Sequence, residues 1–309
     1  DWHLYDWANA APGRIIPLML APWWDMQAAA AEVKRLADQG VHALTLSDNP
    51  TVHGYPSIHN AHWDPLWKAC ADNNVVLCCH IGTGDKAAHA SDESPIDAWI
   101  TSMPISIANS AADWIWAPMW KKYPNLRMAL SEGGIGWIPY LLERADFTHG
   151  HHNAWTNSDF GGKMPSDIFK KHIISCFIED RFGLHNLDYI GEDMVMYECD
   201  YPHSDSVWPN SAEKLWEDVK HLSDETINKI THINAMREFS YDPISKLGRE
   251  NCTVGALKRK AAAVPVETAP ILGMGGAKPN REPGKPVTSG DINRMFENAG
   301  AESTVSGRR

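Results

Sequence analysis

The sequence predicts an α/β fold built around a parallel sheet. Between Arg14 and Lys246, short apolar runs of strand length alternate about six times with segments of helical periodicity, and this alternation is typical of βα units. The run Val75–Cys79 is apolar throughout, as in strands that are buried on both faces of a parallel sheet. A chain of 309 residues is long enough to bury a large core of this kind.

Six strands are expected, with helices between them. The strands are Arg14–Leu20, Val41–Leu46, Val75–Cys79, Leu126–Leu130, His172–Ile178 and Met194–Cys199. The helices with the clearest bounds are Asp25–Gln39, Asp64–Asn73, Ile105–Lys122 and Ile135–Phe147. Asp25 can cap the first helix and Gly40 can end it. Pro118 should kink or split the third helix.

The composition changes near Lys246, where Gly, Pro, Lys, Ala and Thr begin to dominate. Such a segment cannot bury enough apolar area to order itself. We therefore expect a folded domain at residues 1–247 and a flexible or surface-wrapping extension at residues 248–309, with one short helix at Asp291–Asn298. The opening at Asp1 looks like the middle of a helix, which favours a fragment or a processed chain.

The charge and cysteine content exclude several classes of function. Lys and Arg number 28 against 39 Asp and Glu, for a net charge of −11, so nucleic acid and anionic membranes are not expected partners. No apolar run approaches the roughly 20 residues of a membrane span, and no secretion signal opens the chain. Six cysteines are sparse for this length, which favours a cytoplasmic protein with free thiols.

Three expected strands end in residues that can bind a metal or transfer a proton. These residues are His80, Glu132 and Asp200, and the carboxyl ends of barrel strands meet at one mouth. Each has a plainer interpretation: a hydrogen-bonded loop histidine, a helix-capping glutamate and an Asx-turn aspartate. Their shared position favours a divalent metal site. The string His149-Gly-His151-His152 follows a helix, so we expect it at the opposite face, in a surface loop or subunit contact.

Several longer strings resemble the second amidohydrolase family, which includes aminocarboxymuconate-semialdehyde decarboxylase and related aromatic-acid decarboxylases and hydrolases. They are Pro-Gly-Arg14-Ile-Ile-Pro, Gly-Tyr-Pro-Ser-Ile-His59, His62-Trp-Asp-Pro65, Cys-His80-Ile-Gly-Thr-Gly, Ser-Glu132-Gly-Gly-Ile-Gly-Trp-Ile-Pro139 and Cys-Asp200-Tyr-Pro-His-Ser-Asp-Ser-Val-Trp-Pro. The resemblance implies a (β/α)8 TIM-like barrel of the metal-dependent hydrolase type, with one divalent metal. It matches His80 to the metal histidine of strand five and Asp200 to the aspartate of strand eight.

The sequence departs from the family in two ways. The His-x-His of strand one has no counterpart, so we expect a barrel domain that lacks its first strands and shows strands three to eight. The decarboxylase-like members place a histidine where Glu132 stands, and we expect Glu132 to act as a base or an additional ligand. Five further residues are expected to contact substrate or hold the ligands, with solvated loops or ordinary packing as the alternatives: His59, His62, His203, Trp137 and Trp208.

The resemblance implies a metal-dependent hydrolase or carbon–carbon lyase that acts on a small aromatic or cyclic substrate through a metal-bound water. Glu132 and Asp200 would be catalytic, and His80 and Asp200 would bind the metal, which we expect to be zinc, with iron or manganese as alternatives. Two other functions stay open: an inactive barrel serving as a subunit or scaffold, and an iron-dependent redox enzyme. Relatives of this type often pair, which suggests a homodimer.

Overall fold

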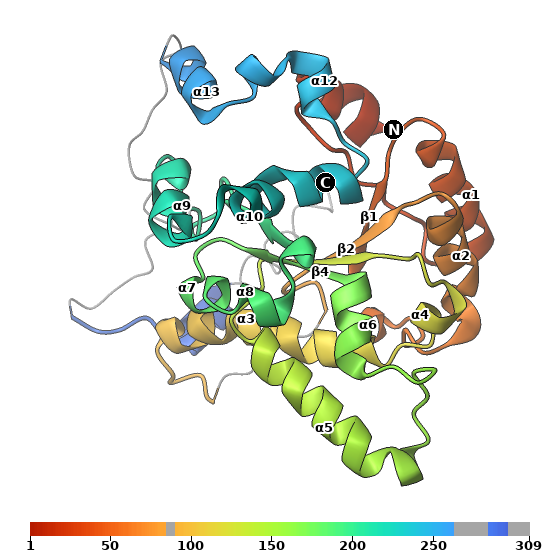
Figure 1. The fold of residues 1–309 in the computed structure, drawn as a ribbon. Coiled ribbons are helices and arrows are strands. Elements are labelled where there is room, and N and C mark those ends of the chain that lie inside the picture. The colour runs from red at the N-terminus through yellow and green to blue at the C-terminus, as the bar shows by residue number, and fades with distance from the viewer. Residues whose placement is uncertain (85–89, 263–283, 296–309) are drawn as a thin grey trace, which may run out of the picture.

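The computed structural model describes residues 1–84, 90–262 and 284–295 (Figure 1). Five strands form one parallel sheet in chain order: β1 (Ala43–Ser47), β2 (Val76–His80), β3 (Met128–Ser131), β4 (Ile173–Phe177) and β5 (Val195–Tyr197). Every neighbouring pair is parallel. The predicted α/β class is confirmed, and the strand order is that of consecutive units in a βα barrel.

The first predicted strand, Arg14–Leu20, is reduced to a single bridge. Met19 pairs with Leu44 beside β1, through a bond from Met19 N to Ala43 O of 2.7 Å and one from Thr45 N to Met19 O of 3.0 Å. Pro17 has no N–H to donate, which restricts a ladder at this position. The prediction of a full strand here was therefore wrong, although the segment does run beside β1.

Thirteen α-helices have both ends within the described residues. They are α1 (Met26–Ala37), α2 (Asp64–Asp72), α3 (Ile96–Ile115), α4 (Met119–Lys122), α5 (Ile138–Thr156), α6 (Pro165–His172), α7 (Arg181–Leu184), α8 (Leu187–Ile190), α9 (Ser211–Val219), α10 (Asp224–Asn228), α11 (Asn234–Glu238), α12 (Pro243–Leu247) and α13 (Val254–Ala261). The Asp25 side chain caps α1 by accepting bonds from Gln27 N and Ala28 N, both at 3.0 Å. Pro118 separates α3 from α4, as predicted.

Two helices are longer than the sequence predicted. α3 begins at Ile96 rather than Ile105, directly after Pro95. α5 continues past Phe147 to Thr156, because Gly150 is tolerated inside it and the stop is Asn157, which adopts a φ of 56°. His149, His151 and His152 therefore lie on the last turns of α5 and not in a loop after it.

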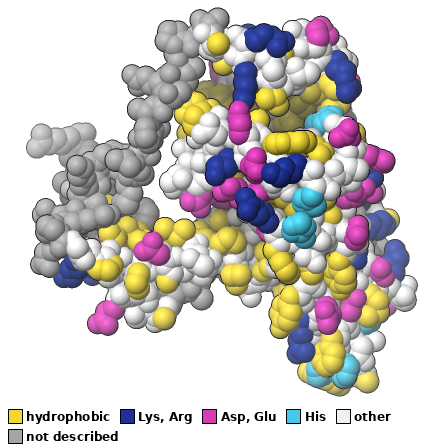
Figure 2. Space-filling model, turned by 60° about the vertical axis from the view of Figure 1, so that its left-hand side comes forward, with side chains coloured by type: hydrophobic (Ala, Val, Ile, Leu, Met, Phe, Trp, Pro, Cys, Tyr) yellow, Lys and Arg dark blue, Asp and Glu magenta, His cyan; other side chains and the backbone are white. Residues whose placement is uncertain are grey.

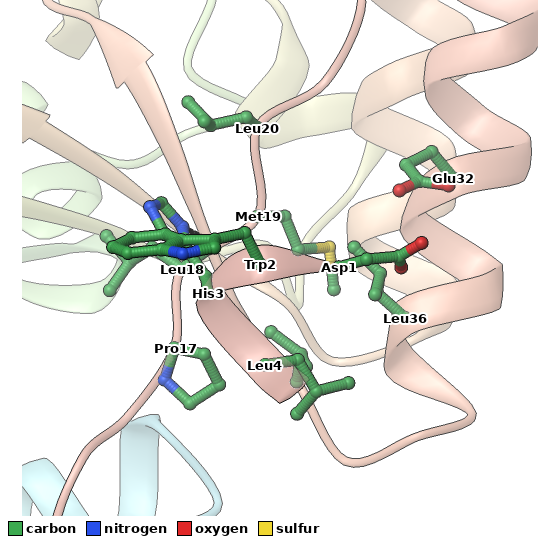
Figure 3. A pocket seen from close by; sticks show the side chains of 11 residues that line it. Asp1, Trp2, His3, Leu4, Pro17, Leu18, Met19, Leu20, Glu32 and Leu36 are labelled. Carbon is green, nitrogen blue, oxygen red and sulfur yellow. Dashed lines mark hydrogen bonds between the residues drawn. The ribbon is translucent and has the colours of Figure 1, made fainter. Parts of the chain in front are cut away.

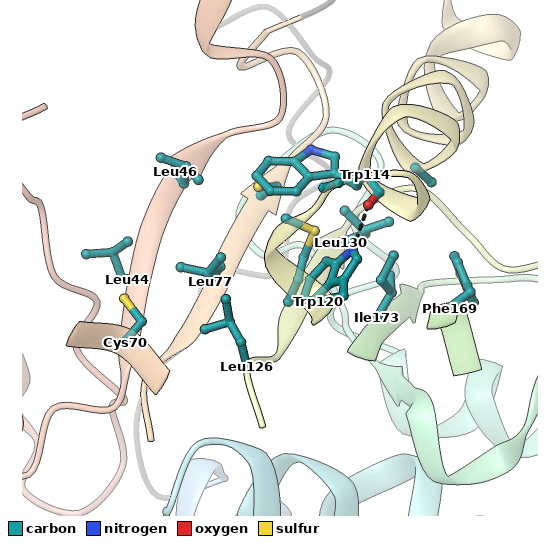
Figure 4. Packing of buried hydrophobic residues seen from close by; sticks show 14 of the residues in the cluster. Leu44, Leu46, Cys70, Leu77, Trp114, Trp120, Leu126, Leu130, Phe169 and Ile173 are labelled. Atoms are coloured by element: carbon teal, nitrogen blue, oxygen red, sulfur yellow. Dashed lines mark hydrogen bonds between the residues drawn. The ribbon is translucent and has the colours of Figure 1, made fainter. Parts of the chain in front are cut away.

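The two faces of the sheet carry different apolar side chains because successive residues of a strand point to opposite sides. On one face Leu44, Leu46, Leu77 and Leu130 pack against the helices, together with Trp114 and other large side chains (Figure 4). The other face carries a cluster of mostly smaller groups: Ala43, Val76, Cys78, Ala129, Ile174, Cys176, Met194 and Met196. All six cysteines are free, and burial raises the pKa of Cys78 to about 12.

The described end of the C-terminal extension lies against the segment that precedes α3. Ile96 N donates to Val287 O at 2.9 Å, and Ser289 N donates to Ser94 O at the same distance. Residues 289–295 are helical, while residues 263–283 and the end of the predicted helix, from 296 onward, lie outside the described residues. None of the helices in the described part of the chain has both the length and the apolar character that crossing a bilayer requires.

His172 is buried at the end of α6, just before β4. It is 1% exposed, and its Nδ1 lies 2.8 Å from Leu126 O, so Nδ1 carries the proton. Burial, only partly offset by this bond, lowers the pKa of His172 to about 4. The folded protein therefore holds His172 neutral in a range where the unfolded chain binds a proton.

This shift predicts an acid-sensitive contribution to stability. Between pH 6.5 and 4 the unfolded state binds more protons at this site, so the contribution is complete above pH 6.5 and decreases by about 3 kcal/mol as the pH falls to 4. His172→Asn can keep a donor near Leu126 O but does not titrate. Urea unfolding of both proteins should show wild type losing its advantage across this range; an unchanged difference would contradict the prediction.

Candidate metal centre

His80, Glu132 and Asp200 meet at the carboxyl ends of the strands. His80 is the last residue of β2, Glu132 follows β3, and Asp200 follows β5. One donor atom from each of the three residues lies within 4.8 Å of those of the other two. Among the described residues they are the one group of three or more histidine, cysteine and carboxylate donors close enough to share an ion, and we call these three residues the metal group. The structure thus brings together the three residues that the strand ends indicated.

Glu132 is the centre of this group. Its Oε2 lies 2.6 Å from His80 Nε2, and its Oε1 lies 3.2 Å from His203 Nδ1. His203 Nδ1 also lies 2.7 Å from Asp200 Oδ2. His80 Nδ1 lies 2.7 Å from Ile81 O, so Nε2 is the atom presented to the carboxylates. A backbone carbonyl behind one ring nitrogen is the arrangement in which the other nitrogen commonly binds a metal.

The backbone at Glu132 and Asp200 is left-handed, with φ values of 65° and 56°. This conformation is uncommon for residues other than glycine and persists where the surroundings impose it. Glu132 N donates to Glu198 Oε1 at 2.7 Å, which fixes the start of the loop after β3. Both carboxylates are consequently turned toward the end of the sheet.

Asp180 anchors the continuation of that loop. Its Oδ2 accepts bonds from Ile135 N at 2.7 Å and Gly136 N at 2.6 Å, while its Oδ1 accepts from Gly183 N at 2.8 Å. Trp137 Nε1 donates to Gly133 O at 2.8 Å from the other side of the loop. The loop that carries Glu132 is therefore held by side chains that do not themselves reach the metal group.

The carboxylates interact strongly because they are close together and partly buried. Burial raises the pKa of Glu132, but the hydrogen bond and charge of His80 outweigh it, so the net pKa is lowered. Burial, and then contact with Glu132, raises the pKa of Asp200. The hydrogen bond to Glu132 is the main reason that the pKa of His80 is raised to about 9. Adjacent carboxylates of this kind are stabilised in their charged forms by a cation.

The five additional predicted residues lie in different places. His203 contacts Glu132 and Asp200 of the metal group. Trp208 packs against Tyr201 in the loop after Asp200, with ring centroids 5.0 Å apart. Trp137 bonds the Glu132 loop, and its ring meets that of Phe169 edge to face. His62 packs on Trp63, with its Nε2 buried and without a hydrogen-bond partner in the described structure.

His59 does not join the group. Its Nε2 lies 2.8 Å from Asp113 Oδ1, and it lines a different cavity. His149 and His151 also lie elsewhere, with His149 near Ser158 Oγ and His151 stacked on Phe147. The prediction that the His149–His152 string is not the metal site agrees with this placement.

A cleft of about 330 Å³ opens beside Glu132. Ile81, Met103, Pro104 and Ile178 form its apolar walls, and Glu179 and Asp205 also line it. Met103 and Pro104 come from α3, so the helix between β2 and β3 contributes one wall. A cleft of this size, with apolar walls and carboxylates on its other side chains, suits a small organic molecule.

Sequence reasoning missed Glu198 and Asp180. Glu198 is largely buried, and burial is the main reason that its pKa is raised to about 7. It stands two residues before Asp200, so strand alternation alone would have placed both on one face. Asp180 gave no comparable signal, because the two N–H groups through which it holds the Glu132 loop lie more than forty residues earlier in the chain.

Two further regions, a small cavity and one face of the surface, show no comparable group of metal-ligating side chains among the described residues. A cavity of about 170 Å³ lies between the start of the chain and α1, lined mainly by apolar side chains such as Leu4, Met19 and Leu36 (Figure 3). Lys and Arg are interspersed with Asp and Glu over the described part of the face in Figure 2, without a continuous basic area there.

Comparison with known proteins gives a family and a fold. A family model described as amidohydrolase matches residues 1–240, and no curated protein matches. A 5-carboxyvanillate decarboxylase from Sphingomonas paucimobilis is 19% identical with a TM-score of 0.61, and the match covers 76% of this chain and 69% of that one. An amidohydrolase from Mycobacterium avium subsp. paratuberculosis is 19% identical at TM-score 0.61, covering 75% of this chain and 62% of its own.

A third similar structure holds a metal. It is a dihydroxybenzoic acid decarboxylase from a Polaromonas species with bound manganese and the inhibitor 2-nitroresorcinol, at 20% identity and TM-score 0.56, covering 75% of this chain and 71% of that one. The present chain spans less than two thirds of the mycobacterial protein and somewhat more of the other two. At sequence identities of 19–20%, the structural similarity to these proteins establishes the fold alone.

The packing at Gly133 predicts a sharp sensitivity in the Glu132 loop. A Cβ at this position would lie 2.1 Å from Ile107 Cγ2, whereas a Cβ on Gly150 in α5 would meet nothing within 4 Å. Gly133→Ala should lower the free energy of unfolding by about 1–3 kcal/mol through overpacking. Gly150→Ala should be neutral or raise it by up to about 1 kcal/mol. Urea unfolding compares the two variants. Equal free energies of unfolding would show that the contact between Gly133 and α3 has room for a methyl group.

Proposed function

The chain belongs to the amidohydrolase family, and on that premise we propose that it is a metal-dependent lyase or hydrolase that acts on a small aromatic or cyclic substrate. The observation that carries the proposal is the meeting of His80, Glu132 and Asp200 at one end of the sheet. Non-oxidative decarboxylation of an aromatic acid is the first reaction to test, because similar structures include decarboxylases of 5-carboxyvanillate and dihydroxybenzoate.

The three side chains fit a divalent ion. They supply one imidazole nitrogen and two carboxylate groups, a donor set that suits zinc, manganese or iron. The resemblance noted in the sequence favours zinc, whereas the Polaromonas decarboxylase holds manganese. We propose His80 and Asp200 as ligands, with Glu132 as a third ligand or a base. When bound, the ion would supply a Lewis acid that polarises a carbonyl or carboxylate oxygen.

The protein's own groups would orient the substrate and move a proton. His203 lies within hydrogen-bonding distance of both Asp200 and Glu132, so a proton can pass between this imidazole and either carboxylate. In a decarboxylation the carbon–carbon bond breaks, carbon dioxide leaves, and the ring carbon accepts a proton, which we propose comes from His203, with Glu132 as its partner in the transfer. Met103 and Ile178 would hold an apolar ring and exclude water beside it.

Two other functions predict different observations. An inactive barrel serving as a subunit or scaffold would bind no metal specifically. An iron-dependent redox enzyme would show a visible spectrum that depends on the metal. A homodimer and a cytoplasmic location stay predictions from the sequence, and the proposed partner is a small-molecule substrate.

Metal content tests the centre directly. After dialysis, the protein should retain close to one divalent ion per chain by elemental analysis, and His80→Ala and Asp200→Asn should each lose most of it, because each removes a donor. His59→Ala is a matched control, since this histidine bonds Asp113 outside the group. Wild-type protein without metal, or undiminished metal in both variants, would refute the centre.

Turnover tests the role of Glu132. Glu132→Gln keeps the shape of the side chain but removes its charge and basicity, so activity should fall by about 10²–10⁴-fold, the range for a lost general acid or base. Carbon dioxide release from hydroxylated aromatic acids and hydrolysis of aromatic esters and lactones would be followed in parallel. Undiminished activity in the variant would exclude Glu132 from the chemistry, and which assay responds decides between lyase and hydrolase.

A further inference from the structure

A second, larger cavity lies at the opposite end of the sheet from the metal centre. Its volume is about 660 Å³, within the range of sites that bind small molecules. It includes His172, which precedes β4, whereas the metal group follows the carboxyl ends of its strands. A five-residue strand such as β4 spans roughly 16 Å, and no residue lining this cavity lines the cleft at Glu132. The two sites are therefore separate.

Aromatic side chains line this cavity. Trp116 and Phe160 meet edge to face with ring centroids 5.7 Å apart. The ring of Trp120 is fixed from behind by a bond from its Nε1 to Trp114 O of 2.6 Å (Figure 4) and lies 4.8 Å from the His172 ring. Trp120 is itself buried, with 3% of its surface exposed, and supports the cavity from behind. Trp116 and Phe160 are partly exposed, so their rings are the surfaces to which another flat ring can pack.

Lysines give the cavity a positive charge within a protein whose net charge is −11. Lys121, Lys163 and Lys171 line it, against one acidic residue, Asp159, which pairs with Lys121. Within the described ranges neither Lys163 nor Lys171 forms an ion pair. Burial, then the charges of Lys163 and Arg127, lowers the pKa of Lys171, as expected of cations that lie close together without a counter-ion.

His172 is among the residues that line this cavity, although only 1% of its surface is exposed. Its Nδ1 faces Leu126 O and so carries the ring proton, which leaves Nε2 as an acceptor in the neutral ring. The cavity therefore combines flat aromatic walls and two cations, with a neutral imidazole between them and the core. A ligand that suits these groups has a planar ring and a negative charge.

We propose that this cavity, lined by Trp116, Trp120, Phe160, Lys163, Lys171 and His172, is a binding site for planar aromatic anions such as aromatic carboxylates. It is distinct from the metal centre and does not depend on the proposed enzymatic function. The aromatic rings bind the apolar face of the ligand, and the two lysines select its charge.

Calorimetric titration of the full chain with 2-naphthoate tests the proposal, with 2-naphthalenemethanol as the neutral analogue. The carboxylate should bind about tenfold or more tightly than the alcohol at low salt, and its advantage should shrink at high salt. The double variant Lys163→Gln/Lys171→Gln should bind both compounds with the affinity of the alcohol. Trp116→Leu should weaken both compounds alike.

Two controls locate the binding. The double variant Lys34→Gln/Lys68→Gln removes one lysine from α1 and one from α2, each of which pairs with an aspartate four residues later. It should bind naphthoate like wild type. His80→Ala should also leave naphthoate binding intact. Equal affinity for acid and alcohol, wild-type binding by the Lys163/Lys171 double variant, or loss of binding in His80→Ala would each overturn the proposal, the last by placing the ligand at the metal centre.

Discussion

The arrangement of the metal group depends on the left-handed turn at Glu132. This turn directs a carboxylate back over the end of β3, where it meets His80 and His203. A backbone of this hand costs free energy for a side chain with a Cβ, and here Glu198 and Asp180 hold it by accepting three backbone N–H bonds. Two acidic residues outside the metal group thus position the one at its centre.

The support extends into the layer of helices. Gly133 lies against Ile107 of α3 so closely that no side chain fits, and the same helix supplies Met103 and Pro104 to the cleft. Trp137 closes the loop from the α5 side. A displacement of α3 would consequently alter both the apolar wall of the cleft and the loop that carries Glu132.

Much of this architecture follows from local patterns in the sequence. Apolar runs predicted all five strands of the sheet to within a few residues. The residues at the ends of these runs included the whole metal group. The patterns failed where tertiary contacts decide. Pro17 limits the first strand to one bridge, Asn157 rather than a glycine ends α5, and His59 lies beside Asp113 although its motif suggested the mouth. Asp180 binds backbone atoms distant in the chain, which no local pattern shows.

The two ends of the sheet differ in the charge they present. At the carboxyl ends, Glu132, Glu179 and Asp205 line the cleft, and Asp200 lies close enough to Glu132 for the two carboxylates to share a cation. At the opposite end, lysines and tryptophans surround a larger cavity. An anionic aromatic molecule is repelled by the first set of side chains unless a metal ion offsets them, and attracted by the second without one. Metal occupancy would therefore govern which of the two sites such a molecule enters first.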